Sequence, residues 1–152
     1  MQGRVALKTP IRRLEGISYW VIEDVDAIYD FVNTEICKEW ETDARSEYRE
    51  PEDDPWLKTL KGRKWRLEVA SMTQIKLNPC IINYVDPRKG YVFSESLEKR
   101  SLELRHSIEQ GGVVLSPLVV RGEDYQLVDG YCRYAMLKEM GVPRTYTYTG
   151  SL

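Results

Sequence analysis

The chain has 152 residues, with 22 Lys and Arg, 24 Asp and Glu, one His and three Cys. That length suits one domain, or one domain with an extension, and an apolar content of 42% is enough for a core. No stretch approaches the roughly 20 apolar residues that cross a bilayer. No apolar segment of a secretory signal follows the basic N-terminal residues either, so we expect a cytoplasmic protein without a membrane partner.

The cysteine and histidine counts exclude several classes of site. Cys37, Cys80 and Cys132 form no C-x-x-C pair, so we expect neither a disulfide framework nor a four-ligand zinc site. A single histidine, His106, excludes the HExxH zinc motif and disfavours a His-centred catalytic triad. The two commonest nucleotide motifs, G-x-x-x-x-G-K-[ST] and G-x-G-x-x-G, are absent as well.

The near-neutral net charge of −2 conceals a strong segregation of charge. Residues 15–54 carry fourteen acidic and three basic side chains, whereas residues 55–66 carry five basic side chains and no acidic one. From residue 76 onward the chain has ten basic and nine acidic side chains. This shift in composition predicts an N-terminal extension over residues 1–71 and a core domain over residues 72–152.

The extension is predicted to hold a strand, an acidic helix, a charged loop and a basic strand. Residues 17–22 favour a strand, and Asp24 can cap the helix that follows. Residues 41–55 are charged, contain two prolines and predict a loop, and the alternation over residues 64–69 predicts a strand. The apolar positions of the helix recur every three or four residues: Val25, Ile28, Val32, Ile36 and Trp40.

The core is predicted to follow the order strand, helix, hairpin, helix, strand. A short strand at 75–77 and a long connection at 80–93 come first. A helix over 96–110 then presents Leu97, Ser101, Leu104 and Ile108 on one face and stops at Gly111-Gly112. A hairpin of 117–121 and 125–128, a helix over 131–140 and a strand over 145–149 complete the domain. The fold class expected is α+β (mixed α/β), with Cys132, Ala135, Met136 and Met140 facing inward from the last helix.

The junction between the hairpin and the last helix is the strongest candidate site. A strand delivers Asp129 to the helix start, where Gly130 has no Cβ and the first-turn amides attract an anion. Arg133 in that turn can pair with a phosphate, and Asp129 can hold Mg²⁺ or take a proton from a hydroxyl. The same residues also fit a purely structural interpretation, with Asp129 as a cap, Gly130 as a turn and Arg133 in solvent.

Three segments resemble the ParB/sulfiredoxin-like superfamily. Residues 127–141, LVDGYCRYAMLKEMG, are similar to its D-G-H-x-R segment, and residues 111–121, GGVVLSPLVVR, to its G-[IV]-x-x-P-[IL]-x-V segment. Residues 75–79, IKLNP, are similar to the strand and Asn-Pro that open the domain. The resemblance covers roughly residues 72–150 and implies a small mixed sheet with packed helices.

The resemblance implies nucleotide binding at the helix start, through Gly130, Tyr131, Cys132 and Arg133. Gly122-Glu-Asp-Tyr and Val128-Asp-Gly look most like the free-serine kinases of the superfamily, although Tyr131 replaces their motif His. Tyrosine can hydrogen-bond a phosphate but is no base near pH 7. The implied activity is a small-molecule phosphotransferase that uses ATP or ADP with Mg²⁺, and its catalytic candidates are Asp129, Glu95 and Glu98, with Asp129 as the metal ligand.

Two alternatives stay open. The basic run Lys61, Arg63, Lys64 and Arg66, with Trp65 interleaved, can track nucleic-acid phosphates and predicts a DNA-associated ParB-like module, either a nuclease or an adaptor. The same run can instead be a strand edge that pairs with the acidic segment before it. The other alternative is an interaction protein that keeps the fold without the chemistry, which the replacement of the motif His by Tyr131 favours.

Overall fold

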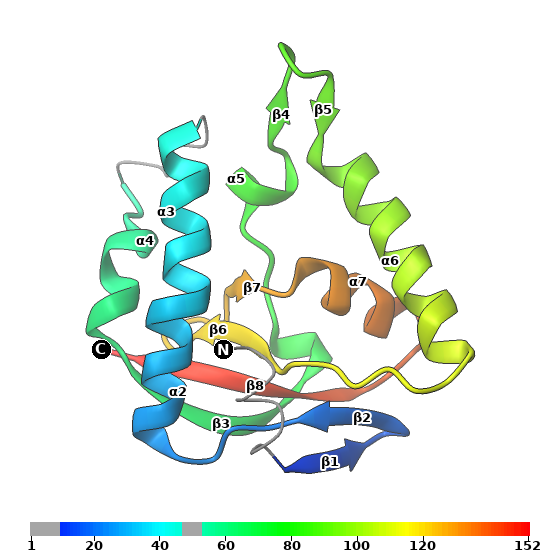
Figure 1. The fold of residues 1–152 in the computed structure, drawn as a ribbon. Coiled ribbons are helices and arrows are strands. Elements are labelled where there is room, and N and C mark those ends of the chain that lie inside the picture. Colours follow the sequence, from blue (N-terminus) through cyan, green and yellow to red (C-terminus); the bar gives the residue numbers. More distant parts are fainter. Residues whose placement is uncertain (1–9, 47–52) are drawn as a thin grey trace.

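A four-stranded mixed sheet forms the base of the molecule in the computed structural model, which describes residues 10–46 and 53–152. Two antiparallel pairs flank one parallel pair, β6 with β8, and helices pack on the sheet (Figure 1). The α+β class is therefore confirmed. The strand order is β3 (Lys64–Ser71), β8 (Arg144–Ser151), β6 (Leu118–Arg121) and β7 (Leu127–Asp129).

The alternation of Thr and Tyr in β8 explains its central place in the sheet. Thr145, Thr147 and Thr149 are buried on one face, and Tyr148 is buried on the other. β-branched and aromatic side chains suit such a pleated, two-sided surface. β8 pairs with β3 over eight residues, from Lys64 opposite Ser151 to Ser71 opposite Arg144.

The N-terminal described residues form a hairpin and a long interrupted helix. β1 (Ile11–Leu14) and β2 (Ile17–Trp20) pair antiparallel, and the backbone N–H of Trp20 donates to the carbonyl of Leu115 at 3.0 Å. Asp24 caps α2 (Val25–Phe31) as predicted, by accepting from the backbone N–H of Ala27 at 2.9 Å.

A π-helical turn over Val32–Ile36 continues α2 into α3 (Cys37–Ser46). The loop predicted over residues 41–55 is thus wrong for residues 41–46, where the backbone stays helical, and residues 47–52 lie outside the described part. The predicted apolar face is largely confirmed. Ile28, Val32 and Ile36 are buried, whereas Val25, at the first turn, is 52% exposed.

The division of the chain at residues 71/72 stays a prediction about folding units. β3, which falls on its N-terminal side, is nevertheless an integral strand of the sheet, and its Trp65 is fully buried. β3 is preceded by the short helix α4 (Trp56–Thr59) and a 3₁₀ turn over Leu60–Gly62, and is followed by a 3₁₀ turn over Met72–Gln74.

The segment between β3 and the long helix holds more structure than the sequence predicts. Of the strand expected at residues 75–77, one parallel bridge forms, between Lys76 and Gln126. Asn78 then caps a short helix, α5. The predicted connection over 80–93 contains a hairpin of two short strands, each of two residues, which projects from the body of the molecule in Figure 1. These elements are α5 (Pro79–Ile82), β4 (Val85–Asp86) and β5 (Tyr91–Val92).

Two packed helices cover the part of the sheet that carries the candidate site. α6 (Phe93–Glu109) buries Leu97 and Ser101, as predicted, and ends before Gly111, whose φ is +88°. α7 (Tyr131–Glu139) buries Tyr131, Tyr134, Met136 and Leu137. The inward face predicted for α7 is confirmed, because Met136 is fully buried and Cys132, Ala135 and Met140 are partly buried and pack against the core. No helix among the described residues is long and apolar enough to span a membrane.

Candidate functional site

The junction between β7 and α7 is built around a glycine that no other residue can replace without strain. Gly130 is the N-terminal flanking residue of α7, with φ +104° and no side-chain capping hydrogen bond. A Cβ there would lie 2.7 Å from Leu118 Cδ2 and 2.8 Å from Arg133 Nη2. The missing Cβ thus makes room for the side chains of Arg133 and Leu118.

Asp129 and Arg133 form an ion pair across this glycine. Arg133 Nη2 donates to Asp129 Oδ2 at 2.9 Å, and Arg133 Nη1 donates to the carbonyl of Ser116 at 2.9 Å. The Arg133 side chain is 17% exposed, so its guanidinium lies mostly inside the protein. Arg133 therefore neutralises Asp129 and ties the start of α7 to the segment that enters β6.

Tyr131, which stands at the position of the motif His, is a buried structural residue. Its hydroxyl donates to the carbonyl of Leu127 at 2.9 Å and accepts from the backbone N–H of Asn78 at 3.1 Å. Its ring lies edge-on to Phe93 of α6, with centroids 5.7 Å apart. The Tyr131 side chain therefore connects β7, α6 and the start of α5, and its hydroxyl forms hydrogen bonds with backbone groups of Leu127 and Asn78.

Cys132 lies in the first turn of α7, among charged side chains of two helices. Burial raises the pKa of its thiol, against the lowering effect of the positive charges of Arg100 and Arg133. The thiol is therefore protonated near neutral pH and is not an activated nucleophile. Arg100 of α6 contributes one of the positive charges that act on this thiol.

Arg100 is the site residue that the sequence analysis missed. Its guanidinium lies over the ring of Phe93, 5.8 Å from the centroid, and its Nε donates to Ser96 Oγ at 3.2 Å. Unlike Arg133, it is exposed to solvent. The one signal in the sequence is the seven-residue spacing from Phe93, which puts both on one helix face.

Glu95 and Glu98 are both exposed on α6. Among the described residues, no hydrogen bond or ion pair joins either of them to Asp129, and no cluster of three or more His, Cys, Asp and Glu side chains could hold a metal ion. The catalytic role of the two glutamates and the metal role of Asp129 stay predictions.

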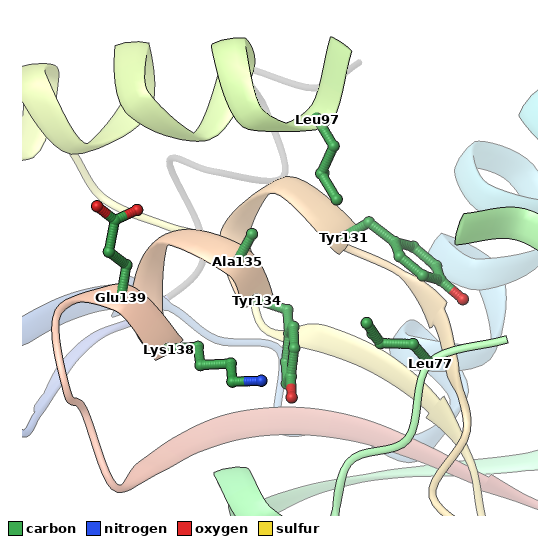
Figure 2. Close-up of a pocket in the computed structure, with 7 residues that line it drawn as sticks. All are labelled: Leu77, Leu97, Tyr131, Tyr134, Ala135, Lys138 and Glu139. Atoms are coloured by element: carbon green, nitrogen blue, oxygen red, sulfur yellow. The ribbon is translucent and has the colours of Figure 1, made fainter. Parts of the chain in front are cut away.

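A cavity of about 450 Å³ runs along the flank of α7, between α7, α6 and Leu77 (Figure 2). Tyr131, Tyr134, Ala135 and Lys138 line it. Tyr134 and Ala135 each lie three or four residues from both Tyr131 and Lys138, so the four share one side of the helix. Leu97 of α6 closes it from the other side, and Glu139 completes the lining.

The basic run predicted for nucleic acid is mostly occupied by partners inside the protein. Arg63 is only 2% exposed and holds the carboxylate of Glu123 with both Nη atoms, the Nη2–Oε2 distance being 2.9 Å. Lys61 pairs with Glu41 at 2.5 Å, and Arg66 pairs with Glu68 at 2.7 Å. Lys64 alone of the four makes no ion pair within the described part of the chain.

Only the Lys61–Glu41 pair joins this run to the acidic segment before it, as the alternative predicts, whereas Arg63 and Arg66 pair with glutamates elsewhere in the chain. Within the described residues, Lys64 is the member of the four that is left for a phosphate backbone. Affinity for nucleic acid grows with the number of phosphates neutralised by Lys and Arg. A DNA-associated module built on these four residues stays a prediction, with Lys64 as its remaining contact.

Comparison with solved structures gives partial likenesses. A pNOB8-like ParB N-domain has 18% identity and a TM-score of 0.42, covering 59% of this chain and 30% of that chain. A second structure of such a domain has 22% identity and a TM-score of 0.38, covering 59% and 29%. Sulfiredoxin from Arabidopsis thaliana has 19% identity and a TM-score of 0.39, covering 56% of this chain and 86% of that chain.

The match spans less than a third of the length of each ParB N-domain structure. No protein-family model matches the chain, and no curated protein does. A function for this protein therefore has to be argued from the geometry of its own site.

Proposed function

We propose that this protein binds a nucleotide, with the nucleotide phosphates at the start of α7. The observation that carries the proposal is the N-terminus of α7, which is flanked by Gly130 and has no side-chain cap. The exposed Arg100 lies over the ring of Phe93, and that ring packs against Tyr131 in the first turn of α7. α7 has nine residues, enough for its first-turn amides and its dipole to attract an anion.

Each residue of the site takes a distinct role in this proposal. The first-turn backbone of Tyr131, Cys132 and Arg133 receives the phosphate, and Arg100 supplies the accessible positive charge. The Arg133 guanidinium, already held by Asp129 and the Ser116 carbonyl, fixes the shape of the helix start. Gly130 contributes by admitting that guanidinium, because any Cβ would collide with it.

Mg²⁺ fits this arrangement through one carboxylate. The Asp129 Oδ2 atom is engaged by Arg133, and no hydrogen bond or ion pair within the described residues engages Oδ1. Protein sites commonly hold Mg²⁺ with one or two carboxylates together with substrate phosphates, so Asp129 and a nucleotide suffice. The bound ion would neutralise phosphate charge. Transfer of a phosphoryl group to a small-molecule acceptor is the finer form of the proposal, with Asp129, Glu95 or Glu98 as the proton acceptor.

Isothermal titration calorimetry with ATP, ADP and CTP, each with Mg²⁺, tests the binding step. We expect at least one of these nucleotides to bind, and we expect Arg100→Gln to weaken that binding by about tenfold, the loss of one charge-assisted contact. Lys99→Gln is the matched control, because it removes a neighbouring exposed charge from the same helix. Absence of binding, or equal weakening by both substitutions, contradicts the proposal.

Phosphoryl transfer needs a separate measurement on the wild-type chain. Release of ADP or AMP in the presence of a mixture of hydroxyl-bearing small molecules would support transfer, with Asp129→Asn as the inactive variant. Tight nucleotide binding without turnover would instead support the non-catalytic interaction protein.

A further inference from the structure

The cavity on the flank of α7 has the size and lining of a small-molecule site. Its volume of about 450 Å³ lies within the range of ligand pockets, roughly 300–1,000 Å³. Leu77, Leu97 and Ala135 supply apolar walls, whereas Tyr134 and Lys138 supply polar groups. The cavity runs along the helix from Tyr131, at its start, to Glu139, at its C-terminal end.

Tyr134 carries a hydroxyl that makes no hydrogen bond to another described residue and is not among the fully enclosed polar atoms, so it opens to the cavity. The residue is only 8% exposed. Other buried tyrosines of the chain satisfy their hydroxyls: Tyr19 with Thr145, Tyr131 with Leu127 and Tyr148 with Ile22. The Tyr134 hydroxyl is therefore available to a ligand.

Lys138 brings a positive charge to the same cavity. It follows Tyr134 by four residues, so the two side chains are neighbours on the helix surface. Its ammonium group makes no ion pair within residues 10–46 and 53–152, whereas the next residue, Glu139, pairs with Arg105 of α6 at 3.4 Å. The acidic residue of the lining is thus neutralised by another partner, and the basic one is left for a ligand.

We propose that this cavity binds a small organic carboxylate with an apolar body. The carboxylate accepts from the Lys138 ammonium and the Tyr134 hydroxyl, and the apolar body packs between Leu77, Leu97 and Ala135. Tyr131 borders both this cavity and the proposed phosphate position, but the polar contacts proposed here involve neither Arg100 nor Arg133. It stands independently of the proposed function.

Methyl NMR with two matched probes tests this site on the full chain. The probes are 4-phenylbutyrate and its neutral analogue 4-phenylbutanol, titrated to millimolar concentration. We expect 4-phenylbutyrate to shift the methyl resonances of Leu77, Leu97 and Ala135 and to bind at least about fivefold more tightly than the alcohol, a typical gain from one exposed charge pair. Absence of shifts at these methyls, or equal affinity for both probes, overturns the proposal.

Substitutions of Lys138 and Tyr134 test which side chains contact the probes. Lys138→Met should weaken the binding of 4-phenylbutyrate about fivefold and should change the affinity for 4-phenylbutanol by less than about twofold. Lys99→Met, an exposed control on α6, should change neither. Tyr134→Phe should weaken the binding of both probes, because each probe can accept a hydrogen bond from the hydroxyl. Unchanged affinity would mean that neither probe contacts this hydroxyl, and it would overturn the contact assigned to Tyr134.

A last variant separates this proposal from the nucleotide site. Arg100→Gln should leave 4-phenylbutyrate binding unchanged. If Arg100→Gln and Lys138→Met weaken the probe equally, the carboxylate is responding to the positive charge of both helices, and the cavity is not its site. Failure of nucleotides to bind would leave these expectations unaltered.

Discussion

Arg133 donates from Nη2 to Asp129 Oδ2 at 2.9 Å, and this contact joins the last residue of β7 to the first turn of α7 across Gly130. The other terminal nitrogen of Arg133 donates to the Ser116 carbonyl, so one guanidinium holds three segments together. The side chain that the sequence marks as the phosphate ligand thus shapes the helix start, and Arg100 is the guanidinium that solvent reaches.

Gly130→Ala should be much more destabilising than Gly111→Ala. Both glycines have positive φ, +104° and +88°, so both substitutions strain the backbone by about 1 kcal/mol. Only at Gly130 would the new Cβ also collide, with Leu118 and Arg133, whereas the space at Gly111 is open. We expect Gly130→Ala to cost about 2–4 kcal/mol in urea denaturation. Equal losses for the two variants would contradict the packing described around Gly130.

Tyr131→Phe and Tyr134→Phe should differ in their effect on stability, because of the two hydroxyls only that of Tyr131 is hydrogen-bonded among the described residues. Loss of the Tyr131 hydroxyl leaves the backbone N–H of Asn78 and the carbonyl of Leu127 without this partner, at a cost of about 1–3 kcal/mol. Loss of the Tyr134 hydroxyl breaks no hydrogen bond within the described residues and should change the free energy of unfolding by less than about 0.5 kcal/mol. Thermal and urea denaturation of both variants would show the difference; the opposite order would be inconsistent with these hydrogen bonds.

Glu123→Ala should destabilise the fold because it leaves the buried Arg63 without its carboxylate. Arg63 keeps the Gly150 carbonyl and the Thr59 hydroxyl, at 3.1 and 3.0 Å, as acceptors. Since Glu123 is itself 47% exposed, we expect a loss of about 1–3 kcal/mol rather than that of a fully buried pair. Glu41→Ala, which breaks the exposed pair with Lys61, is the control and should cost less than about 1 kcal/mol.

Cys37 should make the fold less stable in alkali. Burial raises the pKa of its thiol to about 11, whereas an unfolded chain ionises cysteine near about 8.5. The contribution of the Cys37 thiol to the free energy of unfolding is therefore fully present below about pH 8.5. It decreases as the pH rises toward 11, by at most about 1.4 kcal/mol per pH unit.

Urea denaturation at several pH values between 7.5 and 10 would check this, with Cys37→Ala as the comparison. The variant should be less stable at pH 7.5 but should lose less stability on going to pH 10. Buried tyrosines with raised pKa, Tyr19 and Tyr148, contribute equally to both proteins. Parallel pH profiles would contradict the assignment to Cys37.

The sequence predicted those helices and strands that have a clear capping residue or a regular hydrophobic period. The Asp24 cap, the strand at β3, the face of α6 and the final strand all follow from capping chemistry and from hydrophobic periods of two or 3.6 residues. The helix at residues 41–46 was missed because its charged sequence has no apolar period of its own, and it continues from the helix before it.

The strand, glycine and helix of the β7–α7 junction were predicted from the sequence, but the directions of its side chains were not. The sequence locates the β7–α7 junction, because a strand, a Gly and a helix succeed one another there. It does not reveal which way long side chains turn, so Arg133 looked accessible and Tyr131 looked like a ligand. Arg100 and Lys138 were missed because their importance comes from the packing of α6 against α7, which is a tertiary contact.

Amide NMR during a titration with ADP and Mg²⁺ tests the central claim most directly. If phosphate binds at the start of α7, the backbone amide resonances of Tyr131, Cys132 and Arg133 will show the largest shifts, and Arg100→Gln will reduce the affinity about tenfold while Lys99→Gln does not. Saturating shifts confined to another surface, or no shift at millimolar ADP, would contradict a nucleotide site at this helix.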